Sequence, residues 1–408
     1  RNIVCTDMGG TSFEVGLIVD GSPVAKTESF VERFPLYISA LDVHSIGYGG
    51  GSVVWVDEFG VMKVGPKSAG AIPGPACYDQ GGVEPTVTDA DVILGYIDPD
   101  YFLDGKMKLN KKKSYEAFKG VAQQLGMDVL EAAAGACQIV DAQMADLIRR
   151  KTVGLGLDPR DFVMFAYGGA GPIHGSGYSG ELGVSKLIIP LGNIASSYSA
   201  FGLTATDMQH VEARSEPDKE PFDSSKLVLL FSELEERCTN ALRNEGIVDE
   251  DIKLVRSADM KFTGQIWEIE VPIPDKIGDD IGPELPGLFS KRYDELFGVG
   301  AAEFRGSGCE LLTCRVMAVG KRVKPTIAES SALDKDRGLM KGKRKAYWFE
   351  LKGFSETAVC DGKLLSRGDV IEGPAIIEMP HTAVLVHPGD KAEVDRYGNI
   401  IINLRGSG

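Results

Sequence analysis

The pattern of apolar and polar positions at the start of the chain predicts a β-hairpin. Residues 3–6 form a short apolar run, and residues 13–19 form a second run in which apolar and polar side chains partly alternate, as expected for strands. Asp20 and Gly21 form a two-residue turn signal that leads into Pro23, so the chain turns back once more. The chain therefore begins with two strands joined by a tight connection, followed by a second turn.

The next patterned segments predict another hairpin and two long helices. Residues 53–56 are β-branched or aromatic and form a strand that pairs with residues 61–64 across a turn. Residues 65–91 are rich in Gly and Pro, and such a long irregular stretch is usually functional. Apolar residues at spacings of three and four then predict helices over residues 114–125 and 128–152.

A buried strand over residues 162–167 ends in a glycine-rich stretch at residues 168–171. A helix is predicted directly after it, over residues 174–182, and another strand over residues 185–190. A strand that leads through clustered glycines into a helix lets the backbone approach a flat or charged ligand at the carboxyl end of the strand, where open α/β sheets bind nucleotides. The candidate nucleotide-binding residues of this stretch are Gly168, Gly169 and Gly171.

The remainder of the chain alternates helical and strand patterns. Small residues over 193–202 close the first domain, and the acidic, proline-containing residues 212–223 are interpreted as a linker. Beyond it the pattern predicts helices over 226–245 and 285–297, strands over 254–272 and 308–319, and a β-rich segment over 347–404. The predicted domains are residues 1–212, 213–325 and 326–408.

Composition and charge narrow the class of protein. The chain has 408 residues, of which 43% are hydrophobic and 25% are charged, as is ordinary for a soluble globular protein of two or three domains. Its net charge of -15 argues against polyanionic partners, namely nucleic acid and anionic membrane surfaces. No apolar run reaches the length of a membrane span, and seven scattered cysteines are typical of free thiols in a reducing cytoplasm. The basic residues over 335–345 are interpreted as a solvated surface.

The connection between the first two strands carries the strongest candidate chemistry. After one carboxylate, Asp7, it places two glycines and two hydroxyl residues: Gly9, Gly10, Thr11 and Ser12. Glycine lets backbone N–H groups approach a phosphate, hydroxyls donate to phosphate oxygens, and a carboxylate binds Mg²⁺ or its water. The connection is therefore a candidate phosphate and magnesium site, although an ordinary glycine-rich hairpin explains the same residues.

Further candidates lie between residues 44 and 91. His44 is a candidate ligand or acid/base group, although a lone histidine is more often structural. A second glycine loop precedes a strand and consists of Gly49, Gly50 and Gly51. Asp89 and Asp91 are candidates for a metal or polar site, and Asp89 is alternatively part of the cap of a helix that begins near residue 90.

Five motifs occur in a fixed order along the chain. They begin at residues 7, 49, 68, 85 and 167, and they read Asp-Met-Gly-Gly-Thr-Ser-Phe-Glu-Val, Gly-Gly-Gly-Ser, Ser-Ala-Gly-Ala-Ile-Pro-Gly-Pro-Ala-Cys-Tyr, Pro-Thr-Val-Thr-Asp-Ala-Asp and Tyr-Gly-Gly-Ala-Gly-Pro-Ile-His. Together they resemble the hydantoinase A/5-oxoprolinase family, and later segments extend the resemblance over nearly the whole chain. The family includes ATP-dependent hydantoinases, oxoprolinases, caprolactamase-type enzymes and the nucleotide-binding subunits of acetone and acetophenone carboxylases.

The resemblance implies an α/β fold of the actin/hexokinase type, in which two ribonuclease H-like lobes hold ATP and Mg²⁺ between them. This chain would supply one such ATPase lobe, followed by an α+β domain and a C-terminal β-rich domain. By resemblance, the connection at Asp7 is a phosphate-binding hairpin of the second lobe, and residues 168–171 lie next to the adenosine. We expect ATP and Mg²⁺ as cofactors, Asp7 and His44 as catalytic residues, and Asp7 and Asp89 as metal ligands.

Two enzymatic functions and one non-enzymatic function are compatible with the resemblance. ATP would phosphorylate the amide oxygen of a hydantoin, oxoproline or lactam to drive hydrolysis, or an enolate or bicarbonate oxygen to drive ketone carboxylation. Both reactions need charge neutralisation more than covalent chemistry. The sequence over residues 199–207 is nearer to the carboxylase branch. The alternative is a non-catalytic, actin-like scaffold subunit that responds to nucleotide.

The resemblance also implies partners. Proteins of this fold carry an Asp-Gly-Gly-Thr-type loop in a first lobe as well, whereas this chain holds one such loop, at Asp7. The chain alone should then hold half of an ATP site. We expect an upstream first lobe and a second large subunit, in a cytoplasmic hetero-oligomer that acts on a small-molecule amide or ketone.

Overall fold

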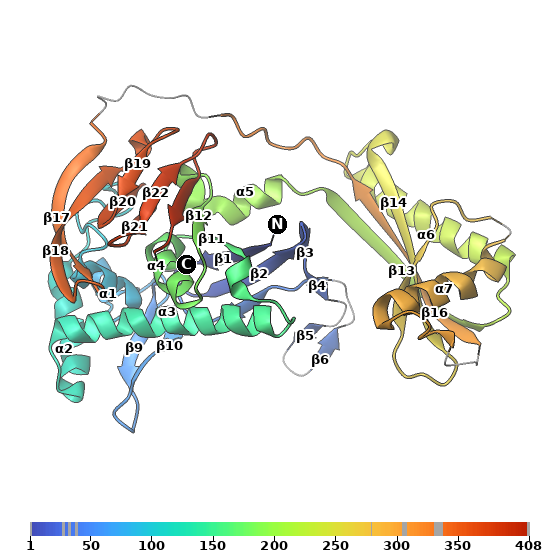
Figure 1. The fold of residues 1–408 in the computed structure, drawn as a ribbon, viewed down its shortest axis with the longest axis horizontal. Helices are drawn as coiled ribbons and strands as arrows, with labels where there is room; N and C mark the ends of the chain where they lie inside the picture. Colours follow the sequence, from blue (N-terminus) through green and yellow to red (C-terminus); the bar gives the residue numbers. More distant parts are fainter. Residues whose placement is uncertain are drawn as a thin grey trace. The chain divides into compact units, whose positions relative to one another are not determined.

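The computed structural model describes residues 2–26, 29–31, 34–36, 40–278, 280–303, 308–329 and 338–405. They form a mixed α/β fold with several sheets (Figure 1). The chain divides into two compact units. The first comprises residues 1–201 and 327–408, and the second comprises residues 202–326. Each unit has its own hydrophobic core.

The first unit is built on a 9-stranded sheet. The strand order is β19 (Val370–Glu372), β22 (Lys391–Val394), β23 (Ile400–Asn403), β12 (Lys186–Ile189), β11 (Val163–Tyr167), β1 (Ile3–Met8), β2 (Phe13–Val19) and β3 (Ser22–Pro23), with β8 (His44–Ile46) also paired to β2. β11 is parallel to both β1 and β12, and the other pairs are antiparallel. The carboxyl ends of β1 and β11 therefore meet at one edge of the sheet.

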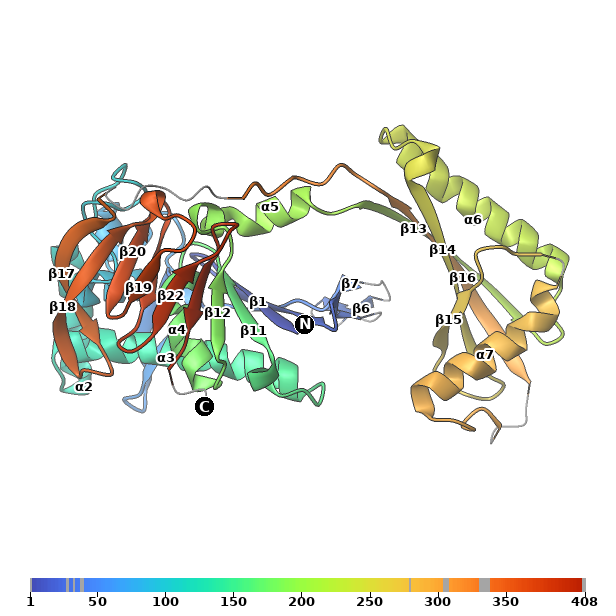
Figure 2. The same cartoon turned by 45° about the horizontal axis from the view of Figure 1, so that its top comes forward.

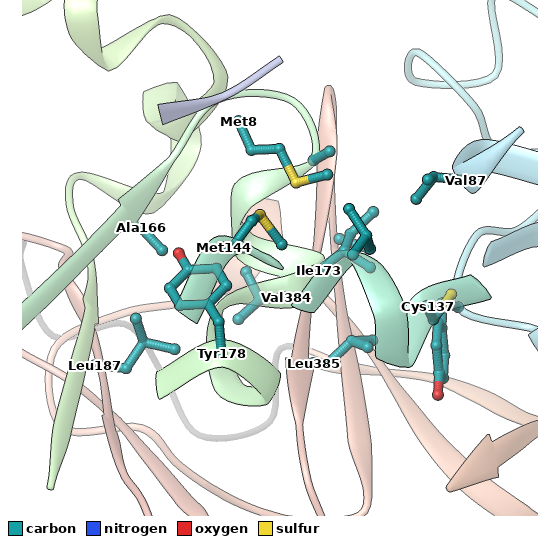
Figure 3. Close-up of a cluster of buried hydrophobic side chains, with 14 of the residues drawn as sticks. Met8, Val87, Cys137, Met144, Ala166, Ile173, Tyr178, Leu187, Val384 and Leu385 are labelled. Atoms are coloured by element: carbon teal, nitrogen blue, oxygen red, sulfur yellow. The ribbon is translucent and has the colours of Figure 1, made fainter. Parts of the chain in front are cut away.

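Some helices of the first unit pack against one face of this sheet. The first unit contains α1 (Val87–Leu94), α2 (Lys111–Leu125), α3 (Val129–Val153), α4 (Gly171–Glu181), α5 (Tyr198–Thr204), η1 (Ala76–Tyr78), η2 (Pro159–Asp161), η3 (Gly192–Ser197) and η6 (Gly362–Leu364). α3 packs against β2, and α4 packs against β1 and β11. Figure 3 shows Met8 of β1 in one buried cluster with Met144 of α3 and Tyr178 of α4. Along β1 every second residue is buried, and the intervening Cys5 and Asp7 lie on the opposite face.

Both predicted hairpins and both predicted long helices are confirmed. β1 and β2 form an antiparallel pair, and β9 (Ser52–Val56) pairs with β10 (Met62–Ser68). α3 begins with a capping box, in which the Asp128 carboxylate accepts a hydrogen bond from the Glu131 N–H group and the Glu131 carboxylate accepts one from the Asp128 N–H group. The last turn of α3 is basic. A cap and a favourable charge at each end stabilise a helix, so these elements follow from local sequence.

The C-terminal residues do not form the separate domain predicted for residues 326–408. Some of them form a four-stranded sheet in the order β17 (Met340–Trp348), β18 (Gly353–Asp361), β20 (Ala375–Met379) and β21 (Thr382–Val386), as Figure 2 shows in part. The last strands extend the central sheet instead, because β23 pairs with β12 and with β22. Pairing between strands so distant in sequence cannot be predicted from local patterns.

The second unit contains a four-stranded antiparallel sheet and two long helices. The strand order is β13 (Met208–Lys219), β16 (Cys309–Gly320), β14 (Ile252–Phe262) and β15 (Ile269–Ile273). The helices α6 (Ser224–Asn244) and α7 (Ile281–Phe297) lie against this sheet (Figure 1). Their apolar side chains share one core with those of the sheet, and η4 (Asp249–Asp251) precedes β14. The predicted strand over residues 254–272 is thus two strands.

The linker predicted at residues 212–223 is wrong, because most of this segment lies in β13. β13 is an edge strand that pairs with β16, and its register shifts between Ser215 and Asp218. Edge strands accept polar side chains and proline, which explains the misleading composition. The boundary between the units lies between residues 201 and 202 rather than at 212.

Two small sheets complete the first unit. β4 (Ala25–Lys26) pairs with β7 (Ala40–Leu41), and β5 (Ser29–Val31) pairs with β6 (Phe34–Leu36). Within the described ranges, no helix has the length and apolar character that a membrane span requires.

Candidate functional site

The connection between β1 and β2 is a tight turn at the carboxyl end of β1. The Gly9 N–H group donates to the Ser12 carbonyl over 3.1 Å. Gly10 and Thr11 form the exposed tip of the turn, and neither of their N–H groups donates to another residue that the structure describes. The turn therefore offers two backbone N–H groups to an external acceptor.

The glycine loop at residues 49–51 lies directly against this turn. The Gly50 N–H group donates to the Gly9 carbonyl over 3.0 Å, and the Gly51 N–H group donates to the Gly10 carbonyl over 2.6 Å. A Cβ atom at position 49 would lie 2.6 Å from the Gly10 carbonyl carbon, which is closer than atoms in a protein can pack. Glycine is therefore required for the two loops to meet.

The glycine-rich turn at residues 168–171 meets the same connection from β11. The Ala170 N–H group donates to the Met8 carbonyl over 2.9 Å. Gly168 has φ +87°, and a Cβ atom there would lie 2.3 Å from the Asp7 Oδ1 atom. Three glycine loops that are far apart in the sequence thus meet at the turn that follows Asp7, and one of them, at Gly168, also packs against the Asp7 carboxylate. We refer to this arrangement as the glycine cradle.

Asp7 is half-buried and lines an open cavity of about 750 Å³. Burial raises the pKa of Asp7, and this effect outweighs a hydrogen bond from the Ser199 hydroxyl of α5, which lowers it. Most of the other residues that line the cavity are aliphatic or acidic, and they include Leu17, Ile18, Val24, Leu41, Val43, Glu14 and Asp42. A cation bound near Asp7 would lower the pKa of this carboxyl group again and favour its charged form.

Asp89 has the capping role rather than an open carboxylate. It is fully buried, and it forms a capping box with Thr86 at the start of α1. Its oxygens accept hydrogen bonds from the backbone N–H groups of Ala76, Cys77 and Thr86 and from the hydroxyls of Thr86 and Ser114. Protein donors thus already surround this carboxylate, and the metal role expected for Asp89 stays a prediction without a contact to support it. Among the residues described, no three His, Cys, Asp or Glu side chains form a group that could hold a metal ion.

His44 lies outside the glycine cradle. It is on β8 opposite Val15, and its Nε2 atom is 3.3 Å from the Asp42 Oδ1 atom. Burial and the positive charge of Lys151 lower the pKa of His44. Asp42 lines the cavity at Asp7, whereas His44 is not among the lining residues. A catalytic role for His44 stays a prediction without a direct contact to support it.

A second, smaller cavity opens beside the glycine-rich turn. Gly169 lies in its wall together with Ile173 of α4, and Gly171 is the first residue of that helix. Most of the remaining wall is aromatic or apolar and includes Tyr96, Ile97, Tyr101, Phe102, Met379 and Pro380. Apolar walls with a few polar groups are typical of small-molecule sites.

The interpretation of residues 335–345 as a solvated surface is wrong for Arg344, while residues 335–337 lie outside the described residues. Arg344 lines the second cavity and is paired with the buried Glu378. Its position in β17 is in phase with the buried Ala346 and Trp348. That period of two is the signal by which the sequence could have placed Arg344 toward the interior.

Comparison with known proteins agrees with this architecture. The hydantoinase/oxoprolinase family pattern matches residues 1–212, and the hydantoinase/oxoprolinase C-terminal domain pattern matches residues 215–405. The chain is 36% identical to the acetophenone carboxylase gamma subunit of Aromatoleum aromaticum over 98% of its own length and 56% of the relative's. It is 33% identical to the caprolactamase subunit alpha of Pseudomonas jessenii, over 97% of its own length and 57% of the relative's.

Solved structures give the same result. An acetone carboxylase in a nucleotide-free form superposes with a TM-score of 0.87 and 28% identity, over 98% of this chain and 58% of that one. The ATP-dependent caprolactamase from Pseudomonas jessenii superposes with a TM-score of 0.77 and 32% identity, over 99% of this chain and 59% of that one. The chain spans just over half the length of these relatives. The two matching patterns together cover nearly every residue, and the chain therefore belongs to the hydantoinase/oxoprolinase family.

Proposed function

We propose that the first unit supplies part of the ATP site of an enzyme that activates an oxygen atom of a small molecule by phosphoryl transfer. The observation that carries this proposal is the convergence of three glycine loops at the turn that follows Asp7. The strand order supports it, because antiparallel β2 and β3 lie on one side of β1, and parallel β11 and β12 on the other. We infer from this order the ribonuclease H-like lobe of an actin-type ATPase.

The residues of the turn at Asp7 would bind the phosphates. The N–H groups of Gly10 and Thr11 point to no described protein acceptor, and the Thr11 hydroxyl lies at the same exposed tip. The Ser12 hydroxyl donates to the Glu14 carboxylate of β2 over 2.7 Å, which orients a second carboxylate beside the turn. Backbone N–H groups of this kind bind phosphate without any positive side chain.

Asp7 is the residue that fits a magnesium ion. Its carboxylate is half-buried, and the hydroxyl of Ser199, a neutral group, donates to it. Mg²⁺, when bound, would neutralise the phosphate charge that builds up during phosphoryl transfer. Asp7 would hold this ion or one of its water ligands. Gly168 leaves Asp7 the room it needs, since any side chain there would collide with the carboxylate.

The second cavity would take the base of the nucleotide. It begins at Gly169, in the same turn that packs against Met8 through Ala170. Its aromatic wall, with Tyr101 and Phe102, suits a flat ring. A nucleotide could then extend from this cavity to the phosphate-binding turn along residues 168–171.

The named relatives define the classes of acceptor substrate. They include subunits of acetophenone carboxylase and acetone carboxylase and a subunit of caprolactamase. In this chain we propose that the same site phosphorylates either an amide oxygen of a cyclic amide, which opens it to water, or an enolate or bicarbonate oxygen, which permits carboxylation of a ketone. Since the relatives are subunits, we also propose that the chain works in a hetero-oligomer.

Replacement of Asp7 by Asn tests the proposal. The variant keeps the hydrogen-bonding shape but removes the negative charge, and we expect ATP turnover by the complete assembly to fall by about 10²-fold or more. Asp20→Asn is the matched control, because Asp20 lies in the turn after β2, outside the cavity at Asp7, and Asn tolerates its positive φ of 51°. Unchanged ATP turnover in Asp7→Asn contradicts the proposal. If the wild-type assembly binds nucleotide but shows no turnover, the chain is instead a scaffold subunit.

A further inference from the structure

A buried histidine joins three helices of the first unit. His174 of α4 is 3% exposed, and its Nδ1 atom lies 2.8 Å from the Asp141 Oδ1 atom of α3. Its Nε2 atom lies 3.6 Å from the Asp91 Oδ2 atom of α1. One imidazole ring therefore sits between two carboxylates that belong to different helices.

The charges of this cluster explain its protonation. Burial alone would lower the pKa of His174, but the charges of Asp141 and Asp91 outweigh burial and raise its pKa to about 10. The imidazole is then a cation at neutral pH and attracts both carboxylates. The Cys137 thiol also donates to the Asp91 Oδ1 atom over 3.6 Å, which fixes that carboxylate from α3.

The packing around the cluster is specific for this arrangement. A Cβ atom at position 177, one turn along α4, would lie 2.2 Å from the Asp141 Oδ2 atom. Gly177 is therefore needed to let the carboxylate approach α4. A glycine inside a helix is destabilising by itself, so its presence here indicates that the contact between Asp141 and α4 matters more than the stability of the helix.

The two outer helices of the cluster begin at the glycine cradle. At the start of α1, the Thr88 N–H group and hydroxyl donate to the Gly50 carbonyl over 2.7 and 2.8 Å. At the start of α4, the Ala170 N–H group donates to the Met8 carbonyl over 2.9 Å. Each helix thus holds one of the loops that pack against the turn at Asp7.

We propose that His174 is a positioning residue, which ties α1 to α4 and thereby sets the separation between the loop at residues 49–51 and the turn at residues 168–171. The inference rests on the proposed function, because these loops matter for catalysis only if they hold a nucleotide. His174 touches neither phosphate nor acceptor in this proposal. It acts through the starts of the two helices.

Asp91→Asn is the main test, made in the complete protein. It leaves the His174–Asp141 pair intact and removes the charge that ties α4 to α1. We expect the N–H groups of Gly50, Gly51 and Ala170 to exchange hydrogen about tenfold faster than in the wild type, and the KM for ATP to rise more than kcat falls. Asp259→Asn is the matched control, because it removes a carboxylate 2.8 Å from Arg315 in the second unit.

Thr88→Val provides a second variant that leaves the buried charges in place. It removes the hydroxyl that donates to the Gly50 carbonyl, so it loosens the same loop from the other end of the link. If the link is real, the effects of Thr88→Val and Asp91→Asn on exchange at Gly50 are not additive. Additive effects in the double variant contradict the proposal, as does unchanged exchange at Gly50 and Ala170 in Asp91→Asn.

Failure of the proposed function would look different. In that case the wild type would show no ATP turnover, while hydrogen exchange in the variants would still report whether α1 and α4 position the loops. The contrary result is that Asp91→Asn lowers the melting temperature and speeds up exchange by the same factor at all amides of the first unit. That result would give His174 a purely structural role and overturn the inference. Should Asp91→Asn not fold, exchange at Ala170 in Thr88→Val decides the question, because the link predicts that it rises there as well.

Discussion

A side chain at position 49 or 168 would collide with the turn at Asp7, and this steric fact explains why glycine occupies both positions. The glycines and Asp7 could be identified from the sequence as candidate phosphate ligands, because their chemistry is local to a short loop. The convergence of the loops and the cluster at His174 could not be identified from the sequence. His174 is 33 positions from Asp141 in the chain, and no local pattern states which carboxylate a buried imidazole meets.

The protonation of His174 predicts how stability depends on pH. Its pKa is raised from the ordinary value of 6.5 to about 10, so the native state binds the proton more tightly than the unfolded state. The stabilisation is complete below pH 6.5 and is lost as pH rises through about 10. Burial also raises the pKa of Asp141, which acts in the same direction at lower pH. Other titratable groups near the cluster are Tyr96, Cys137, Tyr178, Glu181 and His387.

Hydrogen exchange of the amides within α4 measures this effect in the first unit alone. At each pH the wild type is compared with His174→Asn, so that the intrinsic dependence of exchange on pH cancels. We expect the stability difference in favour of the wild type to shrink as pH increases from 6.5 to about 10. A difference that stays constant over this range would show that His174 does not hold a proton in the folded state.

At the scale of elements, segments with local signals could be predicted and segments defined by their partners could not. The capping box at Asp128 marks the start of α3 in the sequence, and apolar periodicity gives its length. β13 shows the opposite case, because its polar composition and Pro217 resemble a linker until its pairing with β16 is known. Likewise, only the pairing of β23 with β12 shows that the C-terminal strands extend the first sheet.

Limited proteolysis distinguishes the observed boundaries from the predicted linker. Residues 321–329 have no regular secondary structure and are nearly all exposed, and they include the trypsin sites Lys321 and Arg322. We expect early cleavage in this segment and protection of β13, whose backbone is paired with β16. Mass spectrometry of the first fragments gives the cut sites. Early cleavage within residues 212–219 would contradict the assignment of β13 as a paired strand.

At the scale of the whole molecule, the exposure of the phosphate-binding turn predicts dependence on other protein. Gly10, Thr11 and Gly169 are all exposed, and charge–dipole contacts in water are strongly screened compared with the same contacts in a closed site. A nucleotide held by this chain alone would leave much of its triphosphate in water. Assembly with further protein over the turn would exclude that water and strengthen each contact.

Calorimetric titration of ATP with Mg²⁺ tests this dependence. We expect residues 1–408 alone to bind ATP more weakly than micromolar, and the complete assembly with its partner subunit to bind at least about tenfold more tightly, a gain of about 1.4 kcal/mol. Asp7→Asn in the assembly is the control, because it should remove the part of the gain that comes through the metal ion. If water reaches the phosphates in the chain alone, binding there must be weaker than in the assembly. Equal affinity in the two forms would therefore mean that the glycine cradle is already a complete site.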